Sequence, residues 1–180
     1  RERDQVLALF ANHSISVLVA TDVAARGLDI VGLEAVINVE LSRDPQIHIH
    51  SIGRSGRAGE KGLALSLVTP AESNRAQAIE ELQQQPLNWQ SLDALKSNYD
   101  PLLPPMHSLC ISAGRKDKVR PGDILGALTG EAGIASDQVG RIAIFDHHAF
   151  VAVARDSARK ALHQLSEGKI KGRRLKVRML

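Results

Sequence analysis

The sequence contains little cysteine, few aromatic residues and no long apolar run. Its single cysteine, Cys110, excludes a disulfide within the chain and fits a reducing compartment such as the cytoplasm. Aromatic residues are limited to three Phe, one Trp and one Tyr. No apolar run approaches the about 18 residues of a membrane-spanning helix. We therefore expect a cytoplasmic protein that makes no membrane contact.

The remaining composition is that of an ordinary globular protein. Of the 180 residues, 43% are hydrophobic and 24% are charged, and this length suits one domain or two small ones. The opening RERDQVLALF is charged and has helical spacing, so it does not resemble a signal peptide. We expect the chain to start inside a domain and to be part of a longer protein.

The charge is distributed unevenly along the chain. Residues 1–105 hold 9 Lys and Arg against 13 Asp and Glu, whereas residues 106–180 hold 14 against 7. The net charges of these segments, −4 and +7, indicate a separate basic surface for a polyanion in the second segment. The alternative is a face that only keeps the protein soluble.

The first part of the chain mixes strand and helix patterns. Apolar runs at 15–20, 33–39 and 62–69 predict strands, and residues 3–12 and 71–85 have helical periodicity. This order predicts an α/β fold, a partial RecA-like parallel-sheet domain over residues 1–86. Residues 87–105 are irregular and punctuated by proline, which indicates a linker.

A different pattern occupies residues 106–180. Strands are predicted at 109–112, 141–145, 150–154 and 175–179, with helices that begin near Pro121 and at 156–165. The order βαββαβ is the ferredoxin-like arrangement of the RRM, an RNA-binding module.

Two sequence motifs carry the most chemical information. Residues 19–30 read VATDVAARGLDI, and residues 46–59 read QIHIHSIGRSGRAG. Together they resemble motifs V and VI of superfamily-2 helicases, specifically the DEAD-box RNA helicases. The resemblance implies that Arg54 and Arg57 are arginine fingers, for which the planar guanidinium suits phosphate oxygens. An isolated RxxR would more often be a solvated basic turn.

The same resemblance implies roles for further residues. Gly27 and Asp29 would contact the nucleotide, with the carboxylate on ribose hydroxyls, although helix capping is the alternative for this aspartate. Thr21 would contact the RNA backbone, and so would Arg3, from a truncated QxxR element. Interdomain contacts are implied for two more residues: Arg26 and His50.

One position departs from the family pattern. The family has arginine directly after the motif VI histidine, whereas this chain has Ser51. We expect that an interdomain contact is lost and that the coupling between ATP and RNA is altered.

The C-terminal segment resembles the RNA-binding domain of DbpA-type bacterial helicases. KDKVRPGDILGALTGEAGI, GRIAIF, FVAVA and GKIKGRRLKVRML carry the likeness. It implies an RNA-dependent ATPase of large-subunit ribosome assembly that docks on a 23S rRNA hairpin. It also implies ATP with Mg²⁺, bound mainly by a first RecA-like domain that this chain does not contain. We expect a monomer whose partners are this RNA and the large-subunit precursor.

RNA contacts within residues 106–180 follow from the RRM pattern. His148 and Phe150 occupy stacking positions, while Cys110 replaces the aromatic residue of the first strand. Core packing is the alternative for Phe150, and the His147–His148 pair lacks further metal-ligand spacing. Shape- and phosphate-weighted recognition is therefore expected from a basic loop and a basic tail: Arg115, Lys116, Lys118, Arg120, Lys169, Lys171, Arg173 and Arg174.

Three functional hypotheses remain open. The chain is the C-terminal part of an ATP-dependent RNA helicase, an RNA-binding module without ATPase activity of its own, or a degenerate helicase-like scaffold. The sequence contains neither a GxxxxGK(S/T) phosphate loop nor a DEAD motif, so we expect no ATPase activity from these 180 residues alone.

Overall fold

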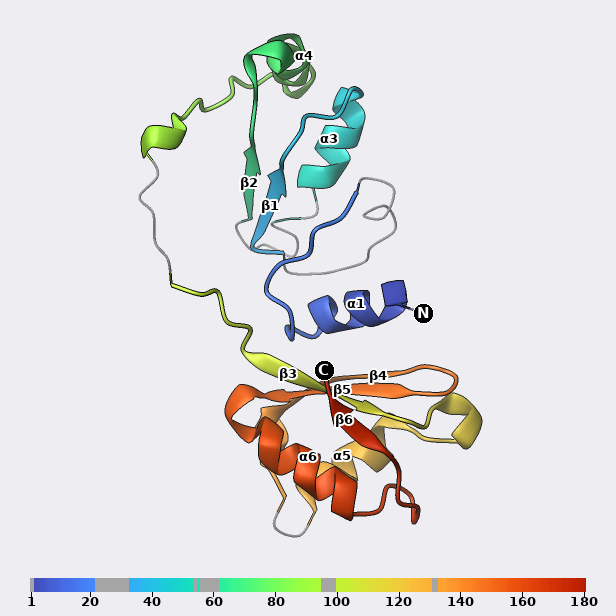
Figure 1. The fold of residues 1–180 in the computed structure, drawn as a ribbon. Coiled ribbons are helices and arrows are strands. Elements are labelled where there is room, and N and C mark those ends of the chain that lie inside the picture. Colours follow the sequence, from blue (N-terminus) through green and yellow to red (C-terminus); the bar gives the residue numbers. More distant parts are fainter. Residues whose placement is uncertain (1, 22–32, 54, 56–61, 95–99, 131–132) are drawn as a thin grey trace. The chain divides into compact units, whose positions relative to one another are not determined.

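The computed structural model describes residues 2–21, 33–53, 55, 62–94, 100–130 and 133–180 (Figure 1). The chain divides into two compact units, one formed by residues 1–18 with 100–180 and the other by residues 19–99. Within the described ranges, no helix has the length and apolarity needed to cross a membrane.

The first unit is built on a four-stranded antiparallel sheet in the order β4-β5-β3-β6. Its strands are β3 (Met106–Ile111), β4 (Val139–Ile144), β5 (Ala149–Ala154) and β6 (Val177–Met179). The helices are α5 (Pro121–Thr129) and α6 (Ala158–Glu167), with short 3₁₀ turns η4 (Arg115–Asp117), η5 (Ser136–Gln138) and η6 (Arg155–Ser157). The βαββαβ order predicted from the sequence is therefore confirmed.

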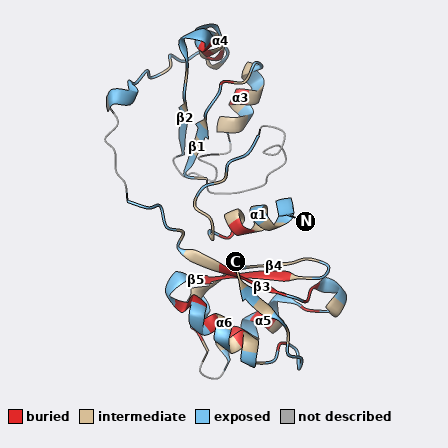
Figure 2. Ribbon diagram, viewed as in Figure 1, coloured by how far each residue is buried: buried red, intermediate tan, exposed pale blue. Residues whose placement is uncertain are grey.

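One face of this sheet forms the core. Both helices lie on that face (Figure 1), where Leu109 and Val151 of the central strands are fully buried with Ile124 and Leu165 of the helices. Buried residues follow β3, β5 and the inner sides of the helices in Figure 2. Because side chains alternate across a strand, the residues between these core positions must lie on the other face.

The second unit contains one pair of parallel strands among its described residues. β1 (Ala35–Asn38) and β2 (Leu63–Ser66) pair in register from Ala35 with Leu63 to Asn38 with Ser66, and α3 (Pro45–Ile52) lies between them in sequence. η2 (Pro70–Glu72), α4 (Ser73–Gln83) and η3 (Leu92–Ala94) follow. The strands predicted at 33–39 and 62–69 and the helix at 71–85 are confirmed, and so is the α/β class.

The strand predicted at residues 15–20 is wrong. These residues follow α1 (Glu2–Ala11) without pairing in a ladder, and the side chains of Val17 and Val19 are 61% and 93% exposed. An apolar run becomes a strand only where a neighbour satisfies its backbone N–H and C=O groups. Sequence periodicity does not report whether such a neighbour is present.

Glu72 holds the start of α4 against the segment that follows β1. Its carboxylate accepts hydrogen bonds from the Leu41 N–H (3.0 Å), the Thr69 N–H (3.1 Å) and the Thr69 hydroxyl (2.7 Å). These hydrogen bonds hold the pKa of the Glu72 carboxyl below its ordinary value of 4.5. The bond from the Thr69 hydroxyl has the largest effect, and the bonds from the Thr69 and Leu41 N–H groups come next. The ionised form of Glu72 is therefore the form that stabilises the fold.

We predict that Glu72→Gln flattens the acid dependence of stability. Because the pKa is lower in the folded state, ionised Glu72 stabilises the unit above pH 4.5, and this contribution is lost as the pH falls through the lowered pKa. Thermal unfolding midpoints from about pH 7 to about pH 3 measure the effect. The exposed Glu81→Gln serves as the control. Equal pH dependence of Glu72→Gln and wild type would contradict the prediction.

Candidate nucleic-acid interface

Three aromatic rings gather where β4 turns into β5. The rings of Phe145 and His148 stack with centroids 4.9 Å apart and an interplanar angle of 10°. Phe150 meets both edge-on, at 5.5 Å and 5.0 Å. Phe150 is only 1% exposed, whereas Phe145 and His148 are half-buried. Of the two predicted stacking residues, His148 therefore lies nearer to solvent, and Phe145 is a ring that the RRM pattern did not indicate.

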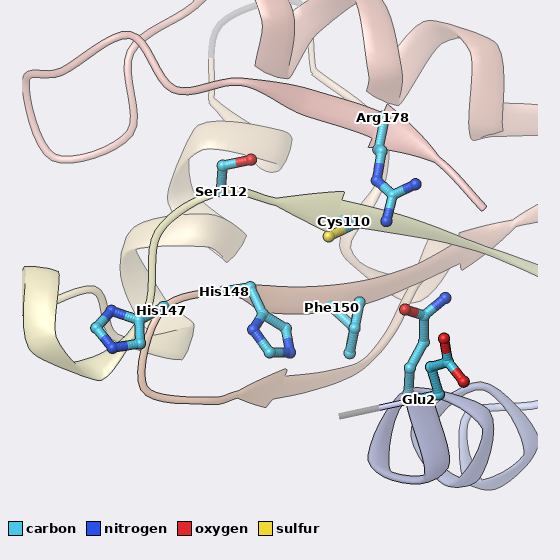
Figure 3. A pocket seen from close by; sticks show the side chains of 8 residues that line it. Glu2, Cys110, Ser112, His147, His148, Phe150 and Arg178 are labelled. Carbon is cyan, nitrogen blue, oxygen red and sulfur yellow. The ribbon is translucent and has the colours of Figure 1, made fainter.

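Arg178 is a second residue that sequence reasoning missed. On β3, Cys110 pairs with Phe150 of β5 on one side and with Arg178 of β6 on the other. The alternation of Leu175, Val177 and Met179 toward the core was the signal that could have found Arg178 on the opposite face. A hollow of about 430 Å³ borders these positions (Figure 3), lined by Glu2, Gln5, Cys110, Ser112, His147, His148, Phe150 and Arg178.

The turn that follows α1 covers one end of this face. The Asn12 side-chain amide donates to the Ser108 hydroxyl (2.7 Å), and the hydroxyls of Ser14 and Ser108 lie 2.9 Å apart. The Met106 N–H donates to the His13 carbonyl (3.3 Å). Ser108 is consequently only 1% exposed.

The basic loop of residues 114–120 lies beside the aromatic rings. The Arg115 N–H donates to the Phe145 carbonyl (2.7 Å), and the Lys116 N–H donates to the Asp146 carbonyl (2.9 Å). The Asp146 carboxylate is also 3.6 Å from the Arg115 guanidinium and 3.9 Å from the Lys116 ammonium. The four predicted cations of this loop are exposed: Arg115, Lys116, Lys118 and Arg120.

The basic turn of residues 169–174 contacts the basic loop. The Lys171 ammonium donates to the Lys118 carbonyl (2.6 Å), and the Arg173 guanidinium lies 3.7 Å from the Asp117 carboxylate. The predicted cations of this turn are exposed as well: Lys169, Lys171, Arg173 and Arg174. The structure thus brings together two groups that are about 50 residues apart in sequence. We call the basic loop and the basic turn together the basic surface.

The His147–His148 pair gains no further potential metal ligands among the described residues. Within the described part of the chain, no three His, Cys, Asp or Glu side chains are grouped so that they could hold a metal ion.

In the other unit, helix α3 carries the start of the second motif. It begins at a capping Asp44, whose carboxylate accepts from the Gln46 N–H (2.9 Å), with Pro45 at its first turn. His48 is buried, and this burial lowers the pKa of its imidazole. His50 is exposed.

Ser51 belongs to a chain of side-chain hydrogen bonds. Its hydroxyl donates to the Asn38 side-chain carbonyl (3.0 Å), and the Asn38 amide donates to the Ser66 hydroxyl (3.2 Å). These contacts connect α3 to the ends of β1 and β2. At the position where the family has arginine, this chain has a short serine side chain that hydrogen-bonds to a residue of its own unit.

The four predicted nucleotide contacts lie outside the described residues: Gly27, Asp29, Arg54 and Arg57. Arg26, predicted to make an interdomain contact, lies outside them as well. Arg3 is exposed on α1, and Thr21 is exposed at the end of its described segment. On either side of Arg54, the Gly53 N–H donates to the Ile49 carbonyl (3.0 Å) and the Ser55 N–H to the Ile52 carbonyl (3.1 Å).

We predict that Ser51→Ala loosens the attachment of α3 to the strand pair. Removal of one partner of a half-buried hydrogen bond costs about 0.5–1.5 kcal/mol of stability, so amide hydrogen exchange in β1 should accelerate about threefold to tenfold. Ser51→Thr keeps the hydroxyl and is the control. Unchanged exchange in Ser51→Ala would show that the observed contact has no energetic role.

Two family models match the chain. The helicase conserved C-terminal domain matches residues 1–59, and the DbpA RNA-binding domain matches residues 108–179. A solved structure of Escherichia coli SrmB bound to RraA, 31% identical, aligns with a TM-score of 0.48 over 55% of this chain and 61% of that chain.

Several curated helicases are similar to the chain. The ATP-dependent RNA helicase DbpA of Escherichia coli K12 is 52% identical over all 180 residues, which span 39% of that protein. Human DDX42 is 57% identical over 42% of the chain and 8% of its own length. CshA of Bacillus cereus is 54% identical over 44% of the chain and 15% of its own length. The chain therefore belongs to the DbpA-type ATP-dependent RNA helicases and corresponds to their C-terminal region, a helicase C-terminal segment followed by the DbpA RNA-binding domain.

Proposed function

We propose that the chain is the C-terminal part of an RNA-dependent ATPase that remodels 23S rRNA during assembly of the large ribosomal subunit. The observation that carries this proposal is the basic surface, which lies in a DbpA RNA-binding domain on the same chain as a helicase C-terminal segment. The proposed limits are 1–86 for the RecA-like part, 87–105 for the linker and 106–180 for the RNA-binding domain. The protein acts as a cytoplasmic monomer, and the large-subunit precursor is its partner.

In this proposal Arg54 and Arg57 stabilise the charge that develops on a phosphoryl group during cleavage. The chemistry of two guanidinium groups fits this task, because each presents paired donors to phosphate oxygens and remains charged. ATP with Mg²⁺, when bound mainly by a first RecA-like domain, supplies the phosphoryl group whose cleavage drives RNA remodelling.

The remaining helicase residues keep the roles that the family resemblance implies. Gly27 and Asp29 bind the nucleotide, and Arg26 and His50 contact the first RecA-like domain. Thr21 and Arg3 contact the RNA backbone without reading its sequence. The exposure of His50, Thr21 and Arg3 is compatible with such contacts.

The RNA-binding domain would recognise a 23S rRNA hairpin by its phosphates and its shape. The cations of the basic surface are exposed, and phosphate contacts dominate the affinity of most nucleic-acid complexes. His148, with Phe145 stacked on it, offers an aromatic face for an unpaired base. Phe150 supports these rings from its buried position.

A second candidate function is RNA binding without ATPase activity in the isolated chain. The absence of a phosphate loop and a DEAD motif from the 180 residues favours it. The purified chain would then bind RNA but show no RNA-stimulated ATP hydrolysis.

We predict that Arg54→Ala or Arg57→Ala, made in the full-length protein, strongly reduces RNA-stimulated ATPase activity. Arginine fingers contribute about 10³–10⁵ to turnover, so kcat should fall by about 10³-fold or more. Steady-state ATPase assays with saturating RNA measure the loss.

The exposed Arg43→Ala, just before α3, is the matched control and should keep wild-type turnover. If both finger variants retain wild-type kcat, the assignment of these arginines is wrong. A degenerate helicase-like scaffold is favoured if the full-length wild-type protein itself shows no RNA-stimulated ATPase activity.

We predict that RNA binding by the chain weakens steeply with salt and that Arg120→Gln and Arg174→Gln each reduce the slope. Each lost phosphate contact lowers the slope of log K against log salt by about 0.7–0.9. Filter binding of a 23S rRNA hairpin across a salt series measures this. Arg159→Gln, exposed on α6, is the control. A flat wild-type slope, or equal binding of an unrelated duplex, would contradict hairpin recognition.

A further inference from the structure

The basic loop has a backbone that the surrounding structure holds closely. Gly114 is buried, and a Cβ atom at this position would collide with the Phe145 carbonyl oxygen and lie 2.7 Å from the His148 backbone nitrogen. Only glycine therefore permits the approach at which Arg115 and Lys116 donate their N–H groups to the β4–β5 turn. The loop is closed by a hydrogen bond from the Val119 N–H to the Gly114 carbonyl (3.1 Å).

Asp117 is the acidic residue within this loop, and it connects several parts of the basic surface. Its carboxylate accepts from the Gly114 N–H (3.0 Å) and lies 3.7 Å from the Arg173 guanidinium. The same guanidinium donates to the Asp117 backbone carbonyl (3.4 Å). Asp117 thus contacts both the start of the basic loop and the basic turn.

The basic turn is held from its other side by the core. Ile170 is 1% exposed, and Val119 of the basic loop is 4% exposed. Ile170 and Arg173 exchange backbone hydrogen bonds of 2.9 Å and 3.1 Å, which close the turn. The Lys171 ammonium also connects the basic turn to the Lys118 carbonyl of the basic loop. Among the described residues, the ion pair between Asp117 and Arg173 links the basic loop and the basic turn by charge.

We propose that Asp117 is a positioning residue that strengthens RNA binding despite its negative charge, because it holds the basic loop and the basic turn as one preorganised phosphate-binding surface. This inference rests on the proposed RNA-binding function. A partly exposed carboxylate repels phosphate only weakly in salt solution. If the loop geometry is lost, in contrast, RNA binding includes the entropic cost of ordering several long cationic side chains.

The experiment measures RNA binding by the 180-residue chain and two pairs of variants. Asp117→Ala removes the acceptor of the Gly114 N–H and the partner of Arg173, whereas Asp117→Asn keeps an oxygen for the Gly114 N–H. Asp137→Ala and Asp137→Asn, at an exposed position in η5, change the net charge identically and leave the basic surface intact. The probes are a 23S rRNA hairpin and an unrelated RNA duplex of equal length.

We expect Asp117→Ala to bind the hairpin about threefold to tenfold more weakly than Asp137→Ala, which corresponds to the loss of about one hydrogen bond. Asp117→Asn should lie between Asp117→Ala and wild type. The salt slope should stay as steep as in wild type, because no cation has been removed. Amide exchange should accelerate in residues 114–119 and remain unchanged in β3 and β5, which separates loop loosening from unfolding.

Two other outcomes decide against the inference. If Asp117→Ala binds as tightly as Asp137→Ala or more tightly, the loop acts by charge alone and the inference is overturned, while the proposed function stands. If Asp117→Ala does not fold, the comparison of Asp117→Asn with Asp137→Asn decides in the same way. If wild type binds neither RNA with a salt-dependent affinity, the proposed function fails and the inference fails with it.

Discussion

The burial of one face of the β3–β5 strand pair determines the layout of the RNA-binding unit. Leu109 and Val151 pack against Ile124 of α5 and Leu165 of α6, and each such side chain leaves its neighbours in the strand on the opposite face. Burial of these groups gives a large part of the stability of a small domain, at about 25 cal/mol per Å² of apolar surface. A slip of one residue would exchange the two faces, so packing also fixes where Phe150 and Arg178 lie.

Electrostatic interactions act on the arrangement that this packing sets. The cations of the basic surface are exposed, and their ion pairs with Asp117 and Asp146 span 3.6–3.9 Å between partly exposed groups. Such pairs contribute little to stability. Their main consequence is geometric, because they orient long side chains that would otherwise sample many rotamers. The backbone hydrogen bonds from Arg115 and Lys116 to the β4–β5 turn give the loop its position.

The elements that local patterns predicted were those with strong periodicity or a clear signal at their ends. The alternation around β4 and β5 and Pro121 at the start of α5 were sufficient to identify the βαββαβ order. Helix α3 was not predicted, although Asp44 and Pro45 are a standard helix start. The run at 15–20 failed for the opposite reason, since its pattern is apolar but no ladder partner pairs with it in the described part of the chain.

The amino-acid sequence by itself determined the type and order of most elements, the two helicase motifs and the excess of positive charge after residue 105. Those features depend on neighbours in sequence, whose spacing sets helix, strand and motif. Only the tertiary structure decided that the basic loop meets the basic turn, that Phe145 stacks on His148 and that Ser51 reaches Asn38. These contacts join segments brought together by packing of the core and strand pairing, which no local pattern encodes.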